Sequence, residues 1–101
     1  MINVLASIRI KTGSLPAFLE IFRANIPKVR TEKGCIEYFP AVDIDTGLPP
    51  QVLDENMVTV IEKWESVEAL RDHLASPHML AYRDKVKDMV AGLSLKVLRE
   101  A

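Results

Sequence analysis

Four segments of the chain alternate between apolar and polar residues, which is the two-residue period of a β-strand. The predicted strands span residues 2–11, 36–44, 57–65 and 93–98. In the second strand, Tyr38 and Phe39 fall on opposite faces, and Pro40 favours an edge position because proline donates no backbone hydrogen bond. The stretch 45–56 holds a glycine and two prolines and is predicted to be a loop.

Between the strands, apolar residues recur at spacings of three and four, the pattern of amphipathic helices. The first such stripe is Leu15, Phe18, Leu19, Phe22, Ile26 and Val29. Pro27 is expected to kink this helix or tighten its last turns, because proline removes one backbone hydrogen bond. A second helical region is predicted in two pieces, since Ser66 and Ser76 both suit N-caps and Gly92 suits the end of the second piece.

The order strand, helix, strand, strand, broken helix, strand predicts an α+β fold. It is the split βαβ arrangement of ferredoxin-like domains, with an antiparallel sheet and helices on one face. The 101 residues are expected to form a single domain, residues 1–101. Nothing in the sequence covers the second face of the sheet, which favours a symmetric partner and hence a homodimer.

Composition narrows the possible partners and the compartment. The chain carries 13 basic and 14 acidic residues, so no basic surface for nucleic acid is expected. Cys35 is the only cysteine, which excludes an intrachain disulfide and a four-thiolate metal site. The first residues lack the features of a signal peptide, and no apolar run approaches the ~18 residues that span a bilayer. We therefore expect a cytoplasmic protein that does not act at a membrane.

Both histidines lie in one short stretch, and their ordinary titration near neutrality makes them candidates for proton transfer. His73 lies beside the buried stripe of its helix, and His78 lies one turn before Tyr82. The alternative for each histidine is a structural role, as a cap of backbone groups or a half-solvated ring. No metal is expected, because the spacing does not match a helical pair of ligands and no third ligand is evident.

Trp64 and Glu62 end the same face of the third predicted strand. Trp64 belongs either to the core or to a ligand site, and Glu62 lies either in solvent at the sheet edge or in a pocket as a polar group. Cys35 is expected to be inert, since no activating residue is adjacent to it in sequence. The glycines are isolated, so neither a nucleotide nor a flavin motif is present and no cofactor is predicted.

Three stretches of the chain resemble the antibiotic biosynthesis monooxygenase (ABM) family, and the likeness extends over essentially the whole sequence. They are the end of the first strand at Lys11-Thr-Gly13, the turn Glu32-Lys-Gly-Cys35, and the run from Ile61 to Met79 with its Trp-Glu-Ser and His-Leu-Ala-Ser-Pro-His motifs. The likeness is closest to the small bacterial quinol monooxygenases of that family. It implies homodimers of ferredoxin-like domains whose sheets meet in a dimeric α+β barrel.

The resemblance also implies an activity: a cofactor-independent monooxygenase that oxidises a quinol-like or polycyclic aromatic substrate with molecular oxygen, without flavin, haem or metal. It assigns catalytic roles to His73 and His78 and substrate contacts to Trp64, Tyr82, Glu62 and Asn3. Because such a substrate supplies the electrons, the protein is expected to provide an apolar slot, a base, and hydrogen-bond donors for the developing negative charge.

Other branches of the same superfamily supply the alternatives. The haem-degrading branch uses an asparagine, tryptophan and histidine triad whose positions correspond by spacing to Ala6, His73 and Arg83. All three residues differ here, which disfavours haem degradation but places His73 where that branch has a ligand-facing residue. Two further functions stay open: isomerisation of a small polar, phosphorylated metabolite in the same pocket, and non-enzymatic ligand binding in a stress response.

Overall fold

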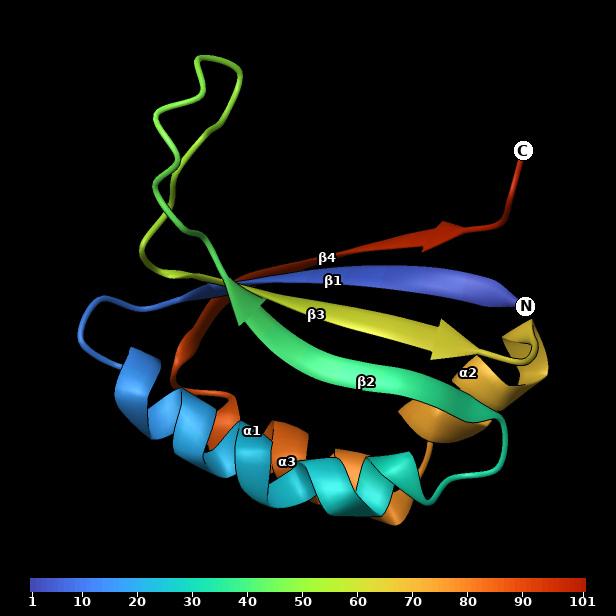
Figure 1. The fold of residues 1–101 in the computed structure, drawn as a ribbon. Coiled ribbons are helices and arrows are strands. Elements are labelled where there is room, and N and C mark those ends of the chain that lie inside the picture. The colour runs from blue at the N-terminus through green and yellow to red at the C-terminus, as the bar shows by residue number, and fades with distance from the viewer.

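In the computed structural model, which describes residues 1–101, four strands form one antiparallel sheet and three helices lie on one of its faces (Figure 1). The elements are β1 (Ile2–Ile10), α1 (Leu15–Arg30), β2 (Cys35–Val42), β3 (Met57–Trp64), α2 (Val67–Leu74), α3 (Pro77–Val86) and β4 (Val90–Leu98). The strands lie side by side in the order β2-β3-β1-β4. The predicted ferredoxin-like α+β arrangement is therefore confirmed, with the broken helix present as α2 and α3.

The core lies between the central strands of the sheet and the helices. Alternate residues of β1 and β3 face the helices, so Ala6 stands opposite Val60 and both are buried. Phe18 and Phe22 of α1 close the core from the helix side. The buried apolar residues are Val4, Ala6, Ile8, Ile10, Phe18, Phe22, Val29, Tyr38, Val58, Val60, Trp64, Leu70, Met79, Tyr82 and Val86.

The two edge strands differ in how well they are covered. β2 is an edge strand, as Pro40 predicts, and its Tyr38 is buried while Phe39 on the other face is 38% exposed. At the opposite edge, Leu93 and Leu95 of β4 point to the helix side yet stay 61% and 46% exposed. They remain open because α1 packs beside β2, at the far edge of the sheet. One side of the helix–sheet layer is therefore unfilled along β4.

The predicted caps of the later helices are confirmed. The Ser66 side chain accepts a hydrogen bond from the Ala69 backbone N–H at 3.1 Å, and the Ser76 side chain accepts one from Met79 at 3.4 Å. The predicted role of Gly92 is wrong, because α3 ends at Val86 and Gly92 lies inside β4. A register shift between Arg9 and Ile10 lets β4 begin pairing at Val90, and this irregularity interrupts the alternation on which the strand prediction rested.

The sheet face away from the helices is covered by no other element (Figure 1). We call it the bare face; Leu5, Phe39 and Ile61 lie on it in neighbouring strands. The loop of residues 43–56 projects from the end of the sheet on the same side and exposes Ile44 and Val52. None of the helices combines the length and the hydropathy that a membrane span requires.

Candidate active site

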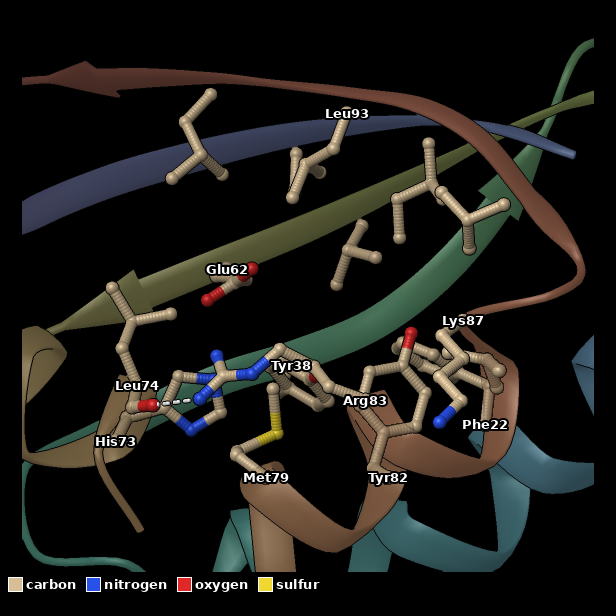
Figure 2. A pocket seen from close by; sticks show the side chains of 16 residues that line it. Phe22, Tyr38, Glu62, His73, Leu74, Met79, Tyr82, Arg83, Lys87 and Leu93 are labelled. Carbon is tan, nitrogen blue, oxygen red and sulfur yellow. Dashed lines mark hydrogen bonds between the residues drawn. The ribbon is translucent and has the colours of Figure 1, made fainter.

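A cavity of about 320 Å³ lies between the sheet and the helices, open toward β4. Its wall consists of Ala6, Ile8, Phe22, Tyr38, Val60, Glu62, His73, Leu74, Met79, Tyr82, Arg83, Val86, Lys87, Val90, Leu93 and Leu95. Twelve of these 16 residues are hydrophobic, and Figure 2 shows the few polar groups among them. The volume is near the lower end of the roughly 300–1,000 Å³ of ligand pockets, so the cavity suits one or two fused rings.

One carboxylate oxygen joins the two histidines. Glu32 Oε2 lies 2.8 Å from His73 Nδ1 and 2.8 Å from His78 Nε2. A carboxylate only accepts, so both contacts are hydrogen bonds in which the imidazole N–H donates. The Ser76 hydroxyl lies 3.2 Å from the same nitrogen of His78 and itself donates to the carbonyl of His73 at 2.8 Å. These bonds fix both rings.

This network determines which nitrogen of His73 can accept a proton. With Nδ1 donating to Glu32, the neutral ring carries its free lone pair on Nε2. Nε2 makes no hydrogen bond in the protein. Since no buried side-chain nitrogen or oxygen lacks a partner, Nε2 keeps some exposure, and the residue lines the cavity. His73 therefore presents a proton acceptor to the cavity while Glu32 holds the other side of the ring.

Burial controls the charge of His73. The side chain is 1% exposed, and its ring lies against Trp64 with centroids 4.6 Å apart and near Tyr38 at 5.4 Å. Desolvation lowers the pKa of His73 below its usual value of 6.5, and the hydrogen bond and charge of Glu32 offset part of this effect. The imidazole is neutral at neutral pH and can act as a base.

Glu62 is the only carboxyl group in the cavity wall. It is 6% exposed, and its Oε1 accepts a hydrogen bond of 2.9 Å from the indole N–H of Trp64. Burial raises the pKa of Glu62 to about 7, against the bond from Trp64, which lowers it. Both protonation states of this carboxyl are therefore accessible near neutral pH, and the protonated state is a hydrogen-bond donor.

Gly34 lets the turn that carries Glu32 approach α2. Its φ of +86° is a conformation that favours glycine, and a Cβ built on it would lie 2.7 Å from the Cβ of Ala69. The backbone carbonyl of Gly34 also accepts a 2.8 Å hydrogen bond from the N–H of Glu65. The Glu32-Lys-Gly-Cys35 turn is thereby held against the start of α2, next to the histidines.

The structure separates the predicted site residues into three groups. His73, Glu62 and Tyr82 line the cavity. Trp64 and His78 lie outside its wall: Trp64 is fully buried and contacts Glu62 and His73, while His78 is bound to Glu32 on the outer side of the cluster. Asn3 is exposed on the bare face, because the strand alternation turns it away from the side on which Val4 and Ala6 point.

Three residues of the site were not among the predicted site residues. Tyr38 could have been found, because it pairs with Glu62 across β2 and β3 and so shares its face. Arg83 follows Tyr82 and lines the cavity. Glu32 belongs to a motif that the sequence does show, but its bonds to histidines 41 and 46 residues away depend on tertiary structure.

The same three residues form a donor set that a metal could use. The ligand atoms of Glu32, His73 and His78 all lie within 4.8 Å of one another. Glu32 is the third ligand that sequence spacing did not suggest. The hydrogen bonds of 2.8 Å already pair these atoms with one another, so the cluster is satisfied as it stands.

Comparisons with known proteins identify the family of the chain. The family model for antibiotic biosynthesis monooxygenases matches residues 1–85. The chain belongs to this family. It is also 37% identical over 101 residues to the protein named "Probable quinol monooxygenase YgiN" of Escherichia coli (strain K12), covering 98% of this chain and 97% of that protein. The resemblance inferred from the motifs is therefore confirmed, and the chain is an ABM enzyme.

Solved structures show the same fold. A conserved protein from Methanosarcina mazei Go1 matches with a TM-score of 0.85 and 19% identity, over 99% of this chain and 92% of that one. Protein SO0527 from Shewanella oneidensis matches with a TM-score of 0.82 and 26% identity, over 98% and 89%. The three positions aligned by spacing with the haem-degrading triad, Ala6, His73 and Arg83, all line the cavity of this ABM enzyme.

Proposed function

We propose that this ABM enzyme is a cofactor-independent monooxygenase that oxidises a quinol-like aromatic substrate with molecular oxygen. The observation that supports this most is His73, a buried neutral imidazole with one nitrogen held by Glu32 and the other free at an apolar cavity. The cavity volume of about 320 Å³ suits a one- or two-ring hydroquinone. The relative named as a quinol monooxygenase supports the same substrate class.

The proposed reaction needs no external reductant. A hydroquinone reacts with one O₂ to give a hydroxyquinone and one water, so the substrate gives up four electrons and receives one oxygen atom. Deprotonation of one hydroxyl makes an electron-rich anion that transfers an electron to O₂. The resulting radicals combine at a neighbouring ring carbon to form a hydroperoxide. Loss of water from this carbon then leaves a carbonyl, which is the hydroxyquinone in its tautomeric form.

In this proposal Nε2 of His73 removes the hydroxyl proton and returns it to the peroxide. Glu32 is a positioning residue that fixes the ring and stabilises the imidazolium. His78 acts through Glu32, since its own contacts are with Glu32 and Ser76 rather than with the cavity. Protonated Glu62 and the phenol of Tyr82 are the donors for the second oxygen of the substrate. Burial raises the pKa of Tyr82, so its hydroxyl stays protonated.

The apolar wall disfavours one alternative. Isomerisation of a small polar metabolite requires many hydrogen-bonding groups around the ligand, whereas 12 of the 16 lining residues are hydrophobic. The non-enzymatic binding alternative leaves the Glu32–His73 pair without a role, since hydrophobic binding requires no oriented base.

We further propose that a second copy of the chain covers the bare face, which gives the dimeric α+β barrel expected from the resemblance. Phe39 and Leu98 are 38% and 43% exposed on this face, and Leu5 and Ile61 lie between them. Glu37 and Lys63 pair in register on the bare face. Because this face carries both a negative and a positive charge, two copies of it can meet without like charges alone facing each other. The projecting loop 43–56 would flank such a partner (Figure 1).

Oxygen uptake with chemically reduced menadione tests the activity. We expect protein-dependent uptake above autoxidation, one O₂ per quinol, and one ¹⁸O atom in the quinone product when ¹⁸O₂ is supplied. H73Q is expected to lower kcat on the order of 100-fold, as loss of a general base does. H78Q is expected to have a smaller effect. Uptake equal to autoxidation, or hydrogen peroxide as the only oxygen product, would contradict monooxygenation of this substrate.

A further inference from the structure

The cavity wall carries two cationic side chains that the proposed oxidation does not use. Arg83 lies on α3 and Lys87 directly follows the last residue of that helix. Both line the cavity and keep some exposure to solvent, so they form part of its rim (Figure 2). They lie in a wall that is otherwise mostly apolar. A cation that is partly withdrawn from water in such a wall, as half-buried Arg83 is, loses hydration, and a bound anion would restore favourable contacts.

Arg83 is oriented but not neutralised. One terminal nitrogen of its guanidinium donates to the backbone carbonyl of Leu74, which fixes the group beside the cavity. Its other N–H groups have no acceptor in the protein, and no carboxylate pairs with it. The Arg83 side chain is half-buried, so a ligand in the cavity can contact it where solvent only partly screens its charge.

Lys87 is placed differently. Its ammonium group lies 3.1 Å from Asp84, and the two side chains are 65% and 75% exposed. This pair remains hydrated and contributes little to the binding of a ligand. Arg83 is therefore the principal cation at the rim, and Lys87 adds a weaker, salt-sensitive attraction.

We propose that Arg83 binds an anionic substituent of the aromatic ligand, so the preferred substrates are hydroxylated aromatic carboxylates rather than neutral quinols. A planar guanidinium matches a carboxylate with two parallel hydrogen bonds, which a neutral substituent cannot form. The rings occupy the apolar cavity, and the carboxylate remains at the open rim beside Arg83. This inference rests on the proposed function for the reaction, but the binding preference itself can be measured without turnover.

Calorimetric titration with 2-naphthoate and its neutral isostere 2-naphthamide tests the preference, because neither compound is oxidised. We expect naphthoate to bind about tenfold more tightly at low salt, as charge-assisted hydrogen bonds allow. R83M should abolish this preference, R83K should retain part of it, and K87M should change it by less than about threefold. R23M, at an exposed position on α1 outside the cavity, is the matched control and should bind as the wild type does.

Several results would overturn the inference. They are equal affinity of the two ligands for the wild type, a preference that survives in R83M, and no binding of either ligand. Glycerol 3-phosphate is a further probe: if it binds as tightly as naphthoate, the rim recognises a small phosphorylated metabolite instead. Because R83M also removes the bond to Leu74, its thermal unfolding is compared with that of R83K, which keeps the charge.

Steady-state kinetics separates this inference from the proposed function. With 1,4-dihydroxy-2-naphthoate and reduced menadione as substrates, R83M should raise KM at least fivefold for the carboxylate and less than about twofold for reduced menadione. An equal loss of kcat for both substrates would mean that Arg83 acts on the reaction rather than on the substituent. Absence of turnover with both substrates, together with an intact naphthoate preference, would contradict the proposed oxidation and leave the anion site standing.

Discussion

Oxygen Oε2 of Glu32 is the atom on which the geometry of the site depends. It lies 2.8 Å from a nitrogen of each histidine, and the two rings come from different helices, α2 and α3. Without this carboxylate, the Nδ1–H of His73 would be buried with no acceptor, which is costly. The tautomer that leaves Nε2 free for the substrate therefore depends on a residue outside the cavity wall.

E32Q is predicted to lower kcat roughly 10- to 100-fold, because it removes the charge that stabilises the imidazolium but keeps the side-chain volume. Glu32 raises the pKa of His73 against the stronger desolvation, so its loss lowers that pKa further. The base must be neutral, and the acidic limb of the kcat/KM profile should therefore move to lower pH. The measurement is oxygen uptake across pH in E32Q and in E20Q, a control at an exposed position on α1, outside the cavity wall and away from the bare face. An unmoved limb would leave Glu32 with a structural role alone.

Glu62 is predicted to make stability fall as pH rises. Its pKa of about 7 in the folded protein exceeds the ordinary 4.5, so between these values the folded state binds more protons than the unfolded state. The free energy of unfolding of E62Q should therefore gain about 2–3 kcal/mol relative to the wild type between pH 5 and pH 8. His73, whose pKa is lowered, contributes the opposite slope below 6.5 in both proteins. Urea titrations at the two pH values measure the difference; a constant difference would show that Glu62 is not desolvated.

At the scale of single residues, the sequence predicted those positions that the period of a strand or a helix determines. Glu62 and Trp64 share a strand face, and His73 lies beside the buried stripe of α2, so alternation and helical spacing suffice for them. Glu32 and Arg83 needed the structure, because the contacts of Glu32 and the orientation of the Arg83 guanidinium depend on how α2 and α3 pack. Asn3 was expected to contact the substrate, but strand alternation alone places it on the bare face, away from the cavity.

At the scale of elements, local chemistry predicted where α2 and α3 begin better than where the last strand begins. The side chains of Ser66 and Ser76 each bond a backbone N–H within three residues, so the sequence contains the whole interaction. The start of β4 depends instead on a bulge in its pairing with β1, and no residue within β4 indicates that bulge. The helix α1 continues through Pro27 to Arg30, so that proline lies within the helix and does not end it.

G34A is predicted to destabilise the protein by at least about 2 kcal/mol, since a positive φ costs an L-residue about 1–2 kcal/mol before any clash is counted. The added methyl would also meet the Cβ of Ala69 at 2.7 Å and push the turn away from α2. G13A is the matched control, because Gly13 has a φ of +88° with open space around it. We expect G34A to lose more stability than G13A and to lower kcat as well, through displaced Glu32. Equal losses in the two variants would contradict the close approach of this turn to α2.

At the scale of the whole molecule, the two faces of the sheet have different requirements. The helix face is filled by the core and by a cavity whose open side lies along β4. The bare face exposes apolar side chains, and no element of the chain covers them. A stable association between two proteins buries about 1,200–2,000 Å² in total. A partner on the bare face would cover this surface and leave the mouth of the cavity, on the other side of the sheet, accessible to substrate.

F39E is therefore predicted to convert a dimer into a folded monomer. Phe39 is 38% exposed on the bare face, so a carboxylate there stays hydrated in the monomer but would be buried without a partner between two sheets. L80E is the matched control, since Leu80 is 56% exposed on α3, away from that face. Sedimentation velocity at micromolar concentration should give a dimer for the wild type and L80E and a monomer for F39E. A wild-type monomer, or a dimer that F39E leaves intact, would contradict the bare face as the site of association.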